Sequence, residues 1–246
     1  MMKSYSNPYP HIIIDNFITK EMCEKLIQEL NAAEKKFKVA SVMGGRTRFN
    51  KENFTLNDEA FKLYEKFNNI KLFNSFFDNL IAETKNSEKK FYIDNFFNDI
   101  EFKKENNLFF KIKKKIFKPL LTNKVFLEMD YSIGRNGYNR EPHHDAPNKI
   151  IVFLLYLNSF ENKDEGGALE IYKYKEKFKD KFLQNPLNEN LELQKKMYPQ
   201  QGQLIIFLSC PNSIHGVEFY KPHDENKRYF VYGSYGSYYN LNWQNN

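Results

Sequence analysis

The sequence has few cysteines, no long hydrophobic run and no apolar N-terminal leader. Its two cysteines, Cys23 and Cys210, cannot build a disulfide framework, which excludes a small disulfide-stapled scaffold and suits a reducing compartment. The longest apolar run, residues 150–157, is far shorter than the roughly 20 residues that a membrane-spanning helix needs. Residues 1–10 are too polar for a signal peptide. We therefore expect a globular protein without a membrane segment, located by default in the cytoplasm.

The sequence also lacks internal repeats and Gly/Ser-rich linkers, so nothing forces a domain boundary. A chain of 246 residues is long enough to bury a substantial core as one unit. We expect a single domain over residues 1–246. Residues 1–123 would supply a strand and a helical support region, and residues 124–240 would form a β-rich core.

The composition is otherwise that of an aromatic-rich globular protein, with 24 Phe, 16 Tyr and a net charge of +6. A basic chain can bind nucleic acid. Here, however, the lysines are spread through segments that read as solvated helix faces, such as residues 111–117. This favours a generic basic surface and argues against a nucleic-acid partner.

The N-terminal half reads mainly as helix. Thr19 is a predicted N-cap for a helix whose apolar residues, including Leu26 and Leu30, recur at helical spacing. Residues 57–124 are also mainly helical in pattern and rich in Phe and Lys. Residues 42–48 combine two glycines with two arginines, which predicts either a surface hairpin or a loop at a site entrance. We interpret this half as scaffold that packs against a sheet.

The C-terminal half contains short strand signals separated by Gly and Pro turns. Residues 124–131 alternate and are rich in β-branched and aromatic side chains, and residues 150–157 form a continuous apolar run typical of a strand buried on both faces. Further strands are predicted within residues 165–172, 203–209 and 228–232. Short strands at close spacing favour a barrel or jelly roll.

A His-x-Asp pair lies among these strands. In an extended segment His143 and Asp145 project to the same face, whereas His144 points to the other. His215, which follows a second apolar strand, is the candidate third ligand. Two His and one carboxylate form the ligand set of non-haem Fe(II) oxygenases. The alternatives are a local His–Asp hydrogen bond in a surface turn and, for His215, a core histidine.

Arg228 begins the last predicted strand, beside Tyr229 and Phe230. An unpaired guanidinium in a semi-buried strand is costly, so we expect an anionic partner, which Arg can bind through two parallel hydrogen bonds.

The order of these motifs resembles the 2-oxoglutarate and Fe(II)-dependent dioxygenase superfamily, and most closely its prolyl 4-hydroxylase-like branch. The resemblance covers about residues 126–235 and rests on the following ordered set: Tyr131-x-x-Gly134, Tyr138, His143-x-Asp145, residues 150–158, Gly166-Gly167-x-Leu169, Gly202-x-Leu204, His215 and Arg228. It implies a mainly β fold with flanking helices (α+β), in which a double-stranded β-helix is buttressed by the N-terminal helices. It also implies Fe(II) held by His143, Asp145 and His215, with 2-oxoglutarate and O2 as co-substrates and ascorbate as a stimulant.

The resemblance assigns further roles in co-substrate binding. Arg228 would hold the distal carboxylate of 2-oxoglutarate, and Tyr131 would hydrogen-bond the same molecule. Tyr138 corresponds to a tyrosine that lies closer to the metal histidine in the family, since two extra residues intervene here. Phe230 stands where the family commonly has Ser or Thr, which implies fewer partners for that carboxylate.

The implied activity is hydroxylation of an unactivated C–H bond with release of succinate and CO2. Asp145 favours hydroxylation over halogenation, because related halogenases carry a small residue there. The substrate would be a prolyl residue or another amino acid or peptide; a sugar or other small metabolite, or a non-catalytic cupin-like binding protein, is the alternative. An AlkB-like nucleic-acid demethylase is disfavoured because Ser234 stands where that family has a second arginine. Residues 173–198 look amphipathic and exceed the family's usual length here, which predicts an inserted lid or substrate-selecting segment.

Overall fold

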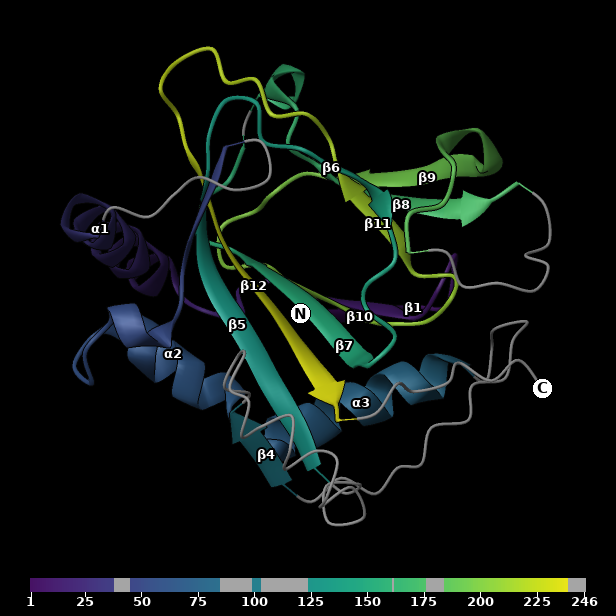
Figure 1. Ribbon diagram of the computed structural model, residues 1–246, viewed down its shortest axis with the longest axis horizontal. Helices are drawn as coiled ribbons and strands as arrows, with labels where there is room; N and C mark the ends of the chain where they lie inside the picture. Colours follow the sequence, from purple (N-terminus) through teal and green to yellow (C-terminus); the bar gives the residue numbers. More distant parts are fainter. Residues whose placement is uncertain (38–44, 85–98, 103–123, 161, 176–183, 239–246) are drawn as a thin grey trace.

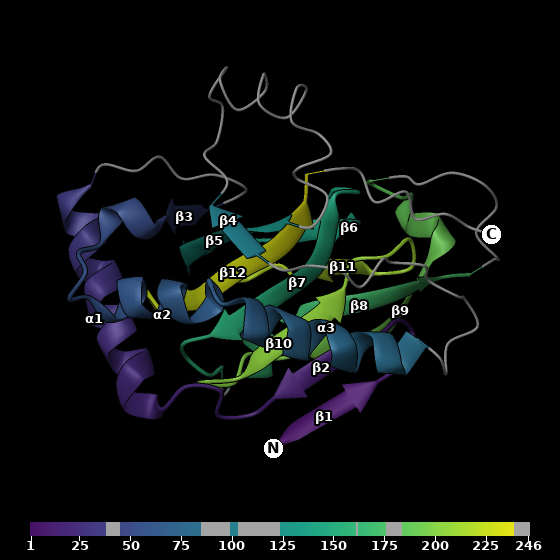
Figure 2. The ribbon, with the colours of Figure 1, turned by 90° about the horizontal axis from the view of Figure 1, so that it is seen from below.

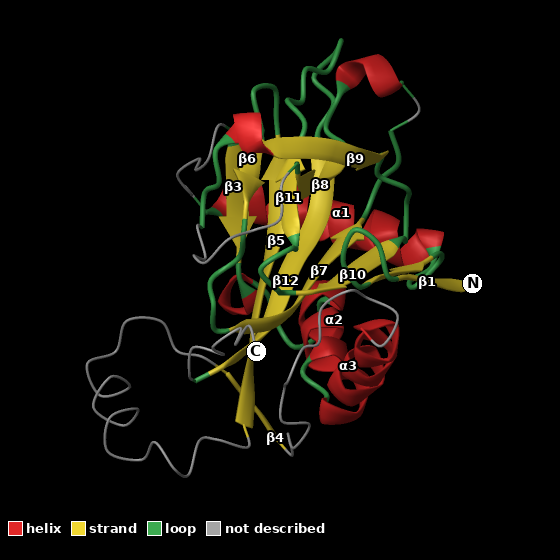
Figure 3. Cartoon of the chain, turned by 90° about the vertical axis from the view of Figure 1, so that its right-hand side faces the viewer, coloured by secondary structure: helices red, strands yellow, loops and turns green. Residues whose placement is uncertain are grey.

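The computed structural model describes residues 1–37, 45–84, 99–102, 124–160, 162–175 and 184–238. Two sheets of eight and four strands face each other (Figures 1 and 3). The larger sheet has the order β1 (Met2–Tyr5), β2 (His11–Ile14), β10 (Leu204–Leu208), β7 (Lys149–Tyr156), β12 (Arg228–Ser237), β5 (Lys124–Gly134) and β3 (Arg46–Phe49), and β4 (Asp99–Phe102) pairs with β5. The smaller sheet has the order β6 (Arg140–His143), β11 (Ile214–Val217), β8 (Leu169–Tyr174) and β9 (Leu191–Met197).

From β5 onward the chain winds between the two sheets. Strands β5, β7, β10 and β12 lie in the larger sheet, and β6, β8, β9 and β11 lie in the smaller one, with β8 and β9 adjacent. Almost every pairing is antiparallel, including the long pairing of β12 with both β5 and β7. This is the double-stranded β-helix expected from the sequence, and the prediction of its fold class is confirmed.

In the described part of the chain, three α-helices cover the outer face of the larger sheet, as Figure 2 shows: α1 (Lys20–Lys36), α2 (Glu59–Phe67) and α3 (Ile70–Thr84). Short 3-10 turns lie at Lys51–Asn53, Lys163–Glu165 and Asn188–Asn190. The predicted cap is present, because Thr19 Oγ1 accepts a hydrogen bond from the Met22 N–H at 3.2 Å. The buried face of α1 carries Leu26 and Leu30, as the periodicity predicted.

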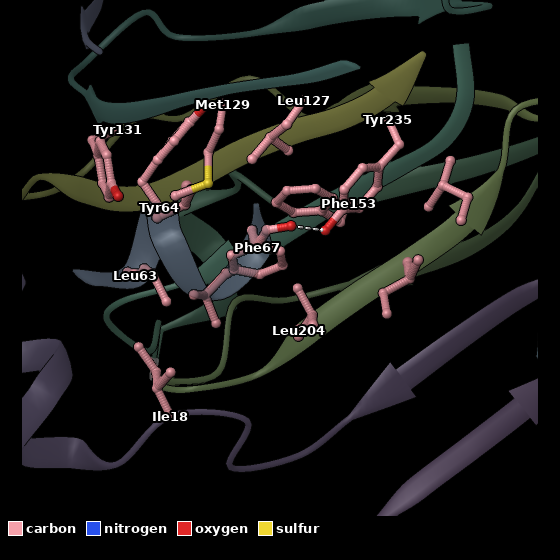
Figure 4. Close-up of a cluster of buried hydrophobic side chains, with 14 of the residues drawn as sticks. Ile18, Leu63, Tyr64, Phe67, Leu127, Met129, Tyr131, Phe153, Leu204 and Tyr235 are labelled. Carbon is pink, nitrogen blue, oxygen red and sulfur yellow. Dashed lines mark hydrogen bonds between the residues drawn. The ribbon is translucent and has the colours of Figure 1, made fainter. Parts of the chain in front are cut away.

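The strands of the larger sheet separate two apolar clusters. The outer cluster packs helices against alternate residues of β5, β7 and β10. In Figure 4 the ring of Phe67 from α2 stacks on Phe153 from β7, with centroids 4.3 Å apart. The Tyr235 hydroxyl donates to the Phe67 carbonyl at 2.6 Å. Burying a side chain such as Phe contributes about 1.5–3 kcal/mol, so this cluster anchors the helices to the sheet.

The reading of residues 173–198 as amphipathic rather than sheet-like is wrong for Leu191–Met197, whereas its role as a lid or substrate-selecting segment stays a prediction. Leu191–Met197 is strand β9, a member of the smaller sheet that pairs antiparallel with β8. Only Leu191 and Met197 are buried in it, and the residues between them are exposed or half-buried. A strand with one largely solvated face carries little apolar signal, which is why its charged sequence resembled a non-sheet segment. Residues 176–183 lie outside the described residues.

The helical reading of residues 57–124 is confirmed for α2 and α3, whereas residues 99–102 form β4. Residues 85–98 and 103–123 lie outside the described residues, as do residues 239–246 of the aromatic C-terminal tail. Residues 46–48 of the predicted hairpin or entrance loop lie in β3 (Arg46–Phe49), which pairs antiparallel with β5. Among the described residues, no helix is both long enough and apolar enough to cross a membrane.

Candidate functional site

Three predicted ligands meet inside the barrel. His143 ends β6, Asp145 lies two residues later, and His215 lies in β11 directly opposite His143 in the strand register. One ligand atom from each of the three residues lies within 4.8 Å of the others. All three residues are buried. His143 and Asp145 thus lie on the same side, as the alternation of side chains along an extended segment predicted.

The two imidazoles present the same nitrogen to this point. His143 Nδ1 donates to the Glu141 carbonyl at 2.8 Å, and His215 Nδ1 donates to the Ser213 carbonyl at 3.1 Å. Those bonds leave each Nε2 with its lone pair, the state that binds a metal ion. Burial lowers the pKa of His143 to about 3 and also lowers the pKa of His215, so both rings are neutral near pH 7.

The Asp145 carboxylate is held by one oxygen and presents the other. Oδ1 accepts hydrogen bonds from Lys149 Nζ at 3.1 Å and from the Tyr232 hydroxyl at 2.9 Å. Oδ2 has no hydrogen-bond partner and lies 3.5 Å from His215 Nε2. Burial opposes ionisation of Asp145, but the adjacent Lys149 charge holds its pKa below the usual value. Two neutral nitrogens and one unpartnered carboxylate oxygen thus fit a divalent cation.

His144 takes no part in this cluster, as predicted. Its Nε2 lies 3.2 Å from the Tyr174 hydroxyl, and its ring stacks on that tyrosine. Burial lowers its pKa to about 4. The neighbouring histidine in the sequence is therefore directed away from the convergence point.

Arg228 is a fully buried cation at the start of β12. Its Nη2 donates to the Tyr156 hydroxyl at 3.4 Å, whereas its Nε and Nη1 have no hydrogen-bond partner. The guanidinium lies over the rings of Tyr138, Tyr156 and Phe230 at 5.5, 5.4 and 4.9 Å. No ion pair to Arg228 is present within the described part of the chain. Burying an unpaired guanidinium costs free energy unless an anion binds to it. The carboxylate of a small acid would be a suitable partner.

Tyr138 lies beside Arg228, whereas Tyr131 does not. The Tyr138 ring stacks on Phe230 with centroids 5.7 Å apart, and Tyr138 is buried in the inner cluster. Tyr131 belongs to the outer cluster, and its hydroxyl donates to the Ala60 carbonyl of α2. The prediction that Tyr131 binds a co-substrate is therefore wrong, because side chains of β5 alternate and Tyr131 faces the helices.

The contact of Tyr156 with Arg228 was not predicted from the sequence. Tyr156 ends the apolar strand β7, is fully buried, and belongs to the inner cluster with Val152 and Leu154. The signal was present in the pattern, because a hydroxyl-bearing residue on the inner face of an otherwise apolar strand needs a polar partner. That partner is Arg228.

A second polar cluster lines the inner face next to Tyr232. Arg46 donates to Asp130 and to Ser132 Oγ at 3.0 Å, and Arg48 donates to Asp130 Oδ2 at 2.8 Å. The Arg46 guanidinium also lies 5.5 Å from the Tyr232 ring centroid. The sequence suggested that these arginines lie in a surface hairpin or an entrance loop; the structure places both on strand β3, with Arg46 buried and Arg48 exposed.

Comparison with known proteins gave one family match and a set of similar structures. Residues 129–235 match the model of the 2OG-Fe(II) oxygenase superfamily. No curated protein sequence matches the chain. A prolyl-4-hydroxylase from Pseudomonas putida is similar at 15% identity with a TM-score of 0.48, over 92% of each chain. HygX from Streptomyces hygroscopicus, with nickel and 2-oxoglutarate bound, is similar at 10% identity with a TM-score of 0.47, over 92% of this chain and 82% of that one.

A further similar structure is a prolyl hydroxylase from Trichoplax adhaerens in complex with a peptide fragment of the hypoxia inducible factor oxygen degradation domain. It has 14% identity and a TM-score of 0.48, over 92% of this chain and 83% of that one. The matched family region runs from β5 to β12 and contains His143, Asp145, His215 and Arg228. The chain thus carries a domain of the 2OG-Fe(II) oxygenase superfamily at residues 129–235 and is an oxygenase that depends on Fe(II) and 2-oxoglutarate.

Proposed function

We propose that this oxygenase hydroxylates an unactivated C–H bond, with His143, Asp145 and His215 as the iron ligands and Arg228 as the anchor of 2-oxoglutarate. The observation that carries the proposal is the pair of unsatisfied charges on one inner face. Asp145 Oδ2 lacks a donor, and the Arg228 guanidinium lacks an acceptor for its Nε and Nη1. A dication and a dianion that bind side by side would satisfy both.

The protein's contribution to this reaction is binding and orientation. Two neutral imidazoles and one carboxylate would hold the metal and leave positions on it open. Arg228 would bind the far carboxylate of 2-oxoglutarate, with Tyr156 and Tyr138 against the guanidinium. When bound, iron and 2-oxoglutarate supply the O2 chemistry, in which the keto acid becomes succinate and CO2 and the substrate gains a hydroxyl group.

Two features connect the metal residues with Arg228. The Phe207 ring lies 4.6 Å from the His215 ring, and Phe207 belongs to the inner cluster that contains Tyr138, Tyr156 and Phe230. An apolar lining of this kind lowers the local dielectric, which would strengthen the attraction between Arg228 and an anion.

The proposed substrate is a prolyl residue or another amino-acid residue in a peptide. The motif order from Tyr138 to Arg228, which resembles the prolyl 4-hydroxylase-like branch, supports this choice. The same chemistry on a sugar or another small metabolite is the alternative outcome. A screen of proline-containing peptides, free amino acids and sugars for substrate-dependent succinate release distinguishes these classes.

The first test is an anaerobic titration of the purified chain with Fe(II) and then with 2-oxoglutarate. We expect the weak visible charge-transfer band of an iron-chelated keto acid in the parent protein. The band should be lost in His143→Ala, whereas His144→Gln, which changes the adjacent histidine facing Tyr174, should retain it. Tight metal binding without any band in the parent would refute the proposed function and favour a metal-binding protein without oxygenase chemistry.

Turnover gives a second, independent test of the ligand set. Each of His143→Ala, Asp145→Ala and His215→Ala should abolish iron-dependent succinate formation, because two remaining ligands hold the ion poorly. Full activity in any one of these variants would show that the residue is not a ligand.

A further inference from the structure

We propose that Lys149 and Tyr232 are positioning residues that hold Asp145 Oδ1 away from the metal, so that the carboxylate binds the ion through Oδ2 alone. This inference rests on the proposed function, since it concerns how the same metal site keeps positions open for 2-oxoglutarate and O2. Neither residue belongs to the predicted ligand set, and neither was identified from the sequence.

Three groups, the Lys149 ammonium, the Tyr232 hydroxyl and Asp145 Oδ1, are hydrogen-bonded to one another. Lys149 Nζ and the Tyr232 hydroxyl both donate to Asp145 Oδ1, at 3.1 and 2.9 Å. Lys149 also donates to the Tyr232 oxygen, and its ammonium lies 4.8 Å from the Tyr232 ring centroid. With two donors on Oδ1 and none on Oδ2, the orientation of the carboxylate is fixed.

The two donors reach Asp145 from different strands. Lys149 begins β7, four residues after Asp145, and Tyr232 lies in β12 of the larger sheet. The side chain of Lys149 is only 14% exposed, so its ammonium is held in place rather than solvated. The chain following β6 is therefore fastened to the larger sheet through the carboxylate itself. Both donors come from neighbouring strands of the larger sheet, whose pairing fixes their positions relative to each other.

The charge of Lys149 adds a second effect. The Lys149 ammonium forms an ion pair with Asp145 Oδ1 at 3.1 Å, and both side chains are largely buried. An ammonium on Oδ1 competes with a metal ion for the same oxygen. A dication entering the site therefore meets a free Oδ2 and an Oδ1 already neutralised.

The consequence concerns coordination number. Carboxylates bind metal ions through one or both oxygens. If Oδ1 were free, it could occupy one of the positions that the two-His-one-carboxylate set leaves open. 2-Oxoglutarate needs two of these positions for chelation and O2 needs another. Restricting Asp145 to one oxygen thus favours the keto acid over a second bond from the protein.

A packing role for the same residues predicts a different outcome. If Lys149 and Tyr232 only supported the barrel, removing them would loosen all three ligands, and affinity for iron and for 2-oxoglutarate would fall together. If they hold Oδ1, their removal frees an oxygen and removes a cation beside the metal. Iron would then bind at least as tightly, while 2-oxoglutarate would bind more weakly.

The test compares Tyr232→Phe, Lys149→Met and the double variant with the parent chain. Fe(II) affinity is measured anaerobically by competition with a chromophoric chelator. 2-Oxoglutarate affinity is measured by titrating the Fe(II)-loaded chain and following the visible charge-transfer band. Tyr229→Phe and Lys196→Met are matched controls: Tyr229 is on the same strand but donates to Asn31 of α1, and Lys196 pairs with Glu170 and Glu218 on the smaller sheet.

We expect Fe(II) to bind each variant no more weakly than the parent, with the 2-oxoglutarate dissociation constant about tenfold higher in Tyr232→Phe and higher again in the double variant. The band should also move to longer wavelength, because a carboxylate freed from its donors gives more electron density to the metal. Unchanged 2-oxoglutarate affinity, or a parallel loss of both affinities, would overturn the inference. Tyr232→Phe is nearly isosteric, which keeps the test available if the double variant fails to fold. Absence of the band in the parent would instead be a failure of the proposed function.

Discussion

The sharpest prediction concerns Arg228, because the change should weaken co-substrate binding without destabilising the metal-free protein. Arg228→Met removes the guanidinium but keeps a flexible side chain in a fully buried position. Two charge-assisted hydrogen bonds to a carboxylate are lost, each contributing about 1.5–3 kcal/mol. The sum of about 3–6 kcal/mol corresponds to a roughly 10²–10⁴-fold higher dissociation constant for 2-oxoglutarate.

Arg228→Met should not lower the stability of the metal-free protein, whereas replacing an arginine that forms an ion pair should lower it. In the metal-free protein Arg228 has two unpartnered nitrogens, so an apolar replacement removes an uncompensated buried charge and should leave the melting temperature unchanged or raise it. Arg46 is the matched comparison, because it is buried but paired with Asp130. Breaking that pair should cost about 3 kcal/mol, with Arg48 still present, and should lower the melting temperature by about 6–12 °C.

The assay pairs thermal unfolding of the metal-free variants with 2-oxoglutarate titration of the Fe(II)-loaded ones. Arg228→Lys is included because it restores the charge without the planar pair of donors, and it should recover only part of the affinity. A destabilised Arg228→Met protein would show that the guanidinium is already compensated in the free state. Unchanged 2-oxoglutarate affinity would refute the assignment of Arg228 as its anchor.

Three further predictions test the electrostatics and the packing. Burial lowers the pKa of His143 to about 3 and of His144 to about 4, so the unfolded chain binds more protons than the folded one between about pH 6.5 and pH 4. The metal-free protein should therefore lose stability as pH falls through that window, by up to about 1.4 kcal/mol per pH unit for each imidazole, and melts that do not change with pH would contradict this. Tyr131→Phe should lower the free energy of unfolding by about 1 kcal/mol, measured with denaturant, and should leave the affinity for 2-oxoglutarate unchanged. Weaker 2-oxoglutarate binding would show that Tyr131 does take part in binding the co-substrate. Gly233→Ala would place its Cβ 2.0 Å from the Phe153 ring, so it should destabilise the protein by about 1–3 kcal/mol, and a wild-type melt would show that the ring can move.

The metal ligands were predictable because their signal is local and periodic. The two-residue period of a strand selects His143 and Asp145 and excludes His144, and the structure shows that separation. The burial of Arg228 was predictable for a similar reason, since its neighbours in the strand are apolar, whereas its role as an anion anchor stays a prediction. In both cases the chemistry of a few residues decided the assignment without knowledge of the sheet order.

The role predicted for Tyr131 in co-substrate binding was wrong because it followed the family resemblance. The alternation of side chains along β5 instead places Tyr131 on the outer face. On β5, Leu127, Met129, Tyr131 and Ile133 all lie in the outer cluster. The polar residues between them, at positions 130 and 132, face inward and bond to Arg46. The orientation of Tyr131 could have been predicted from the sequence of β5, because polar and apolar residues alternate along it and Tyr131 shares a face with the apolar ones.

Lys149 and Tyr232 could not have been assigned from the sequence. Tyr232 lies 87 residues from Asp145, and its contact depends on the register of β12 in the larger sheet. Strand β9 was not predicted for another reason. Only its two end residues are buried and most residues between them are charged, so the sequence lacks the apolar alternation typical of a strand. Non-local pairing and solvated strand faces are therefore the parts of this fold that the sequence leaves open.

Strand β12 shows how one segment serves both folding and chemistry. Its residues alternate so that Val231 and Tyr235 pack in the outer cluster beneath the helices, while Phe230 packs in the inner cluster and Tyr232 bonds to Asp145. A slip of one residue would exchange the two faces and move Arg228 toward the helices. The long pairing of β12 with β5 and β7 opposes such a slip, and Tyr235, bonded to α2, fixes the same register. Outer-face contacts thus help to determine which β12 side chains face the candidate metal site, although none of them touches it.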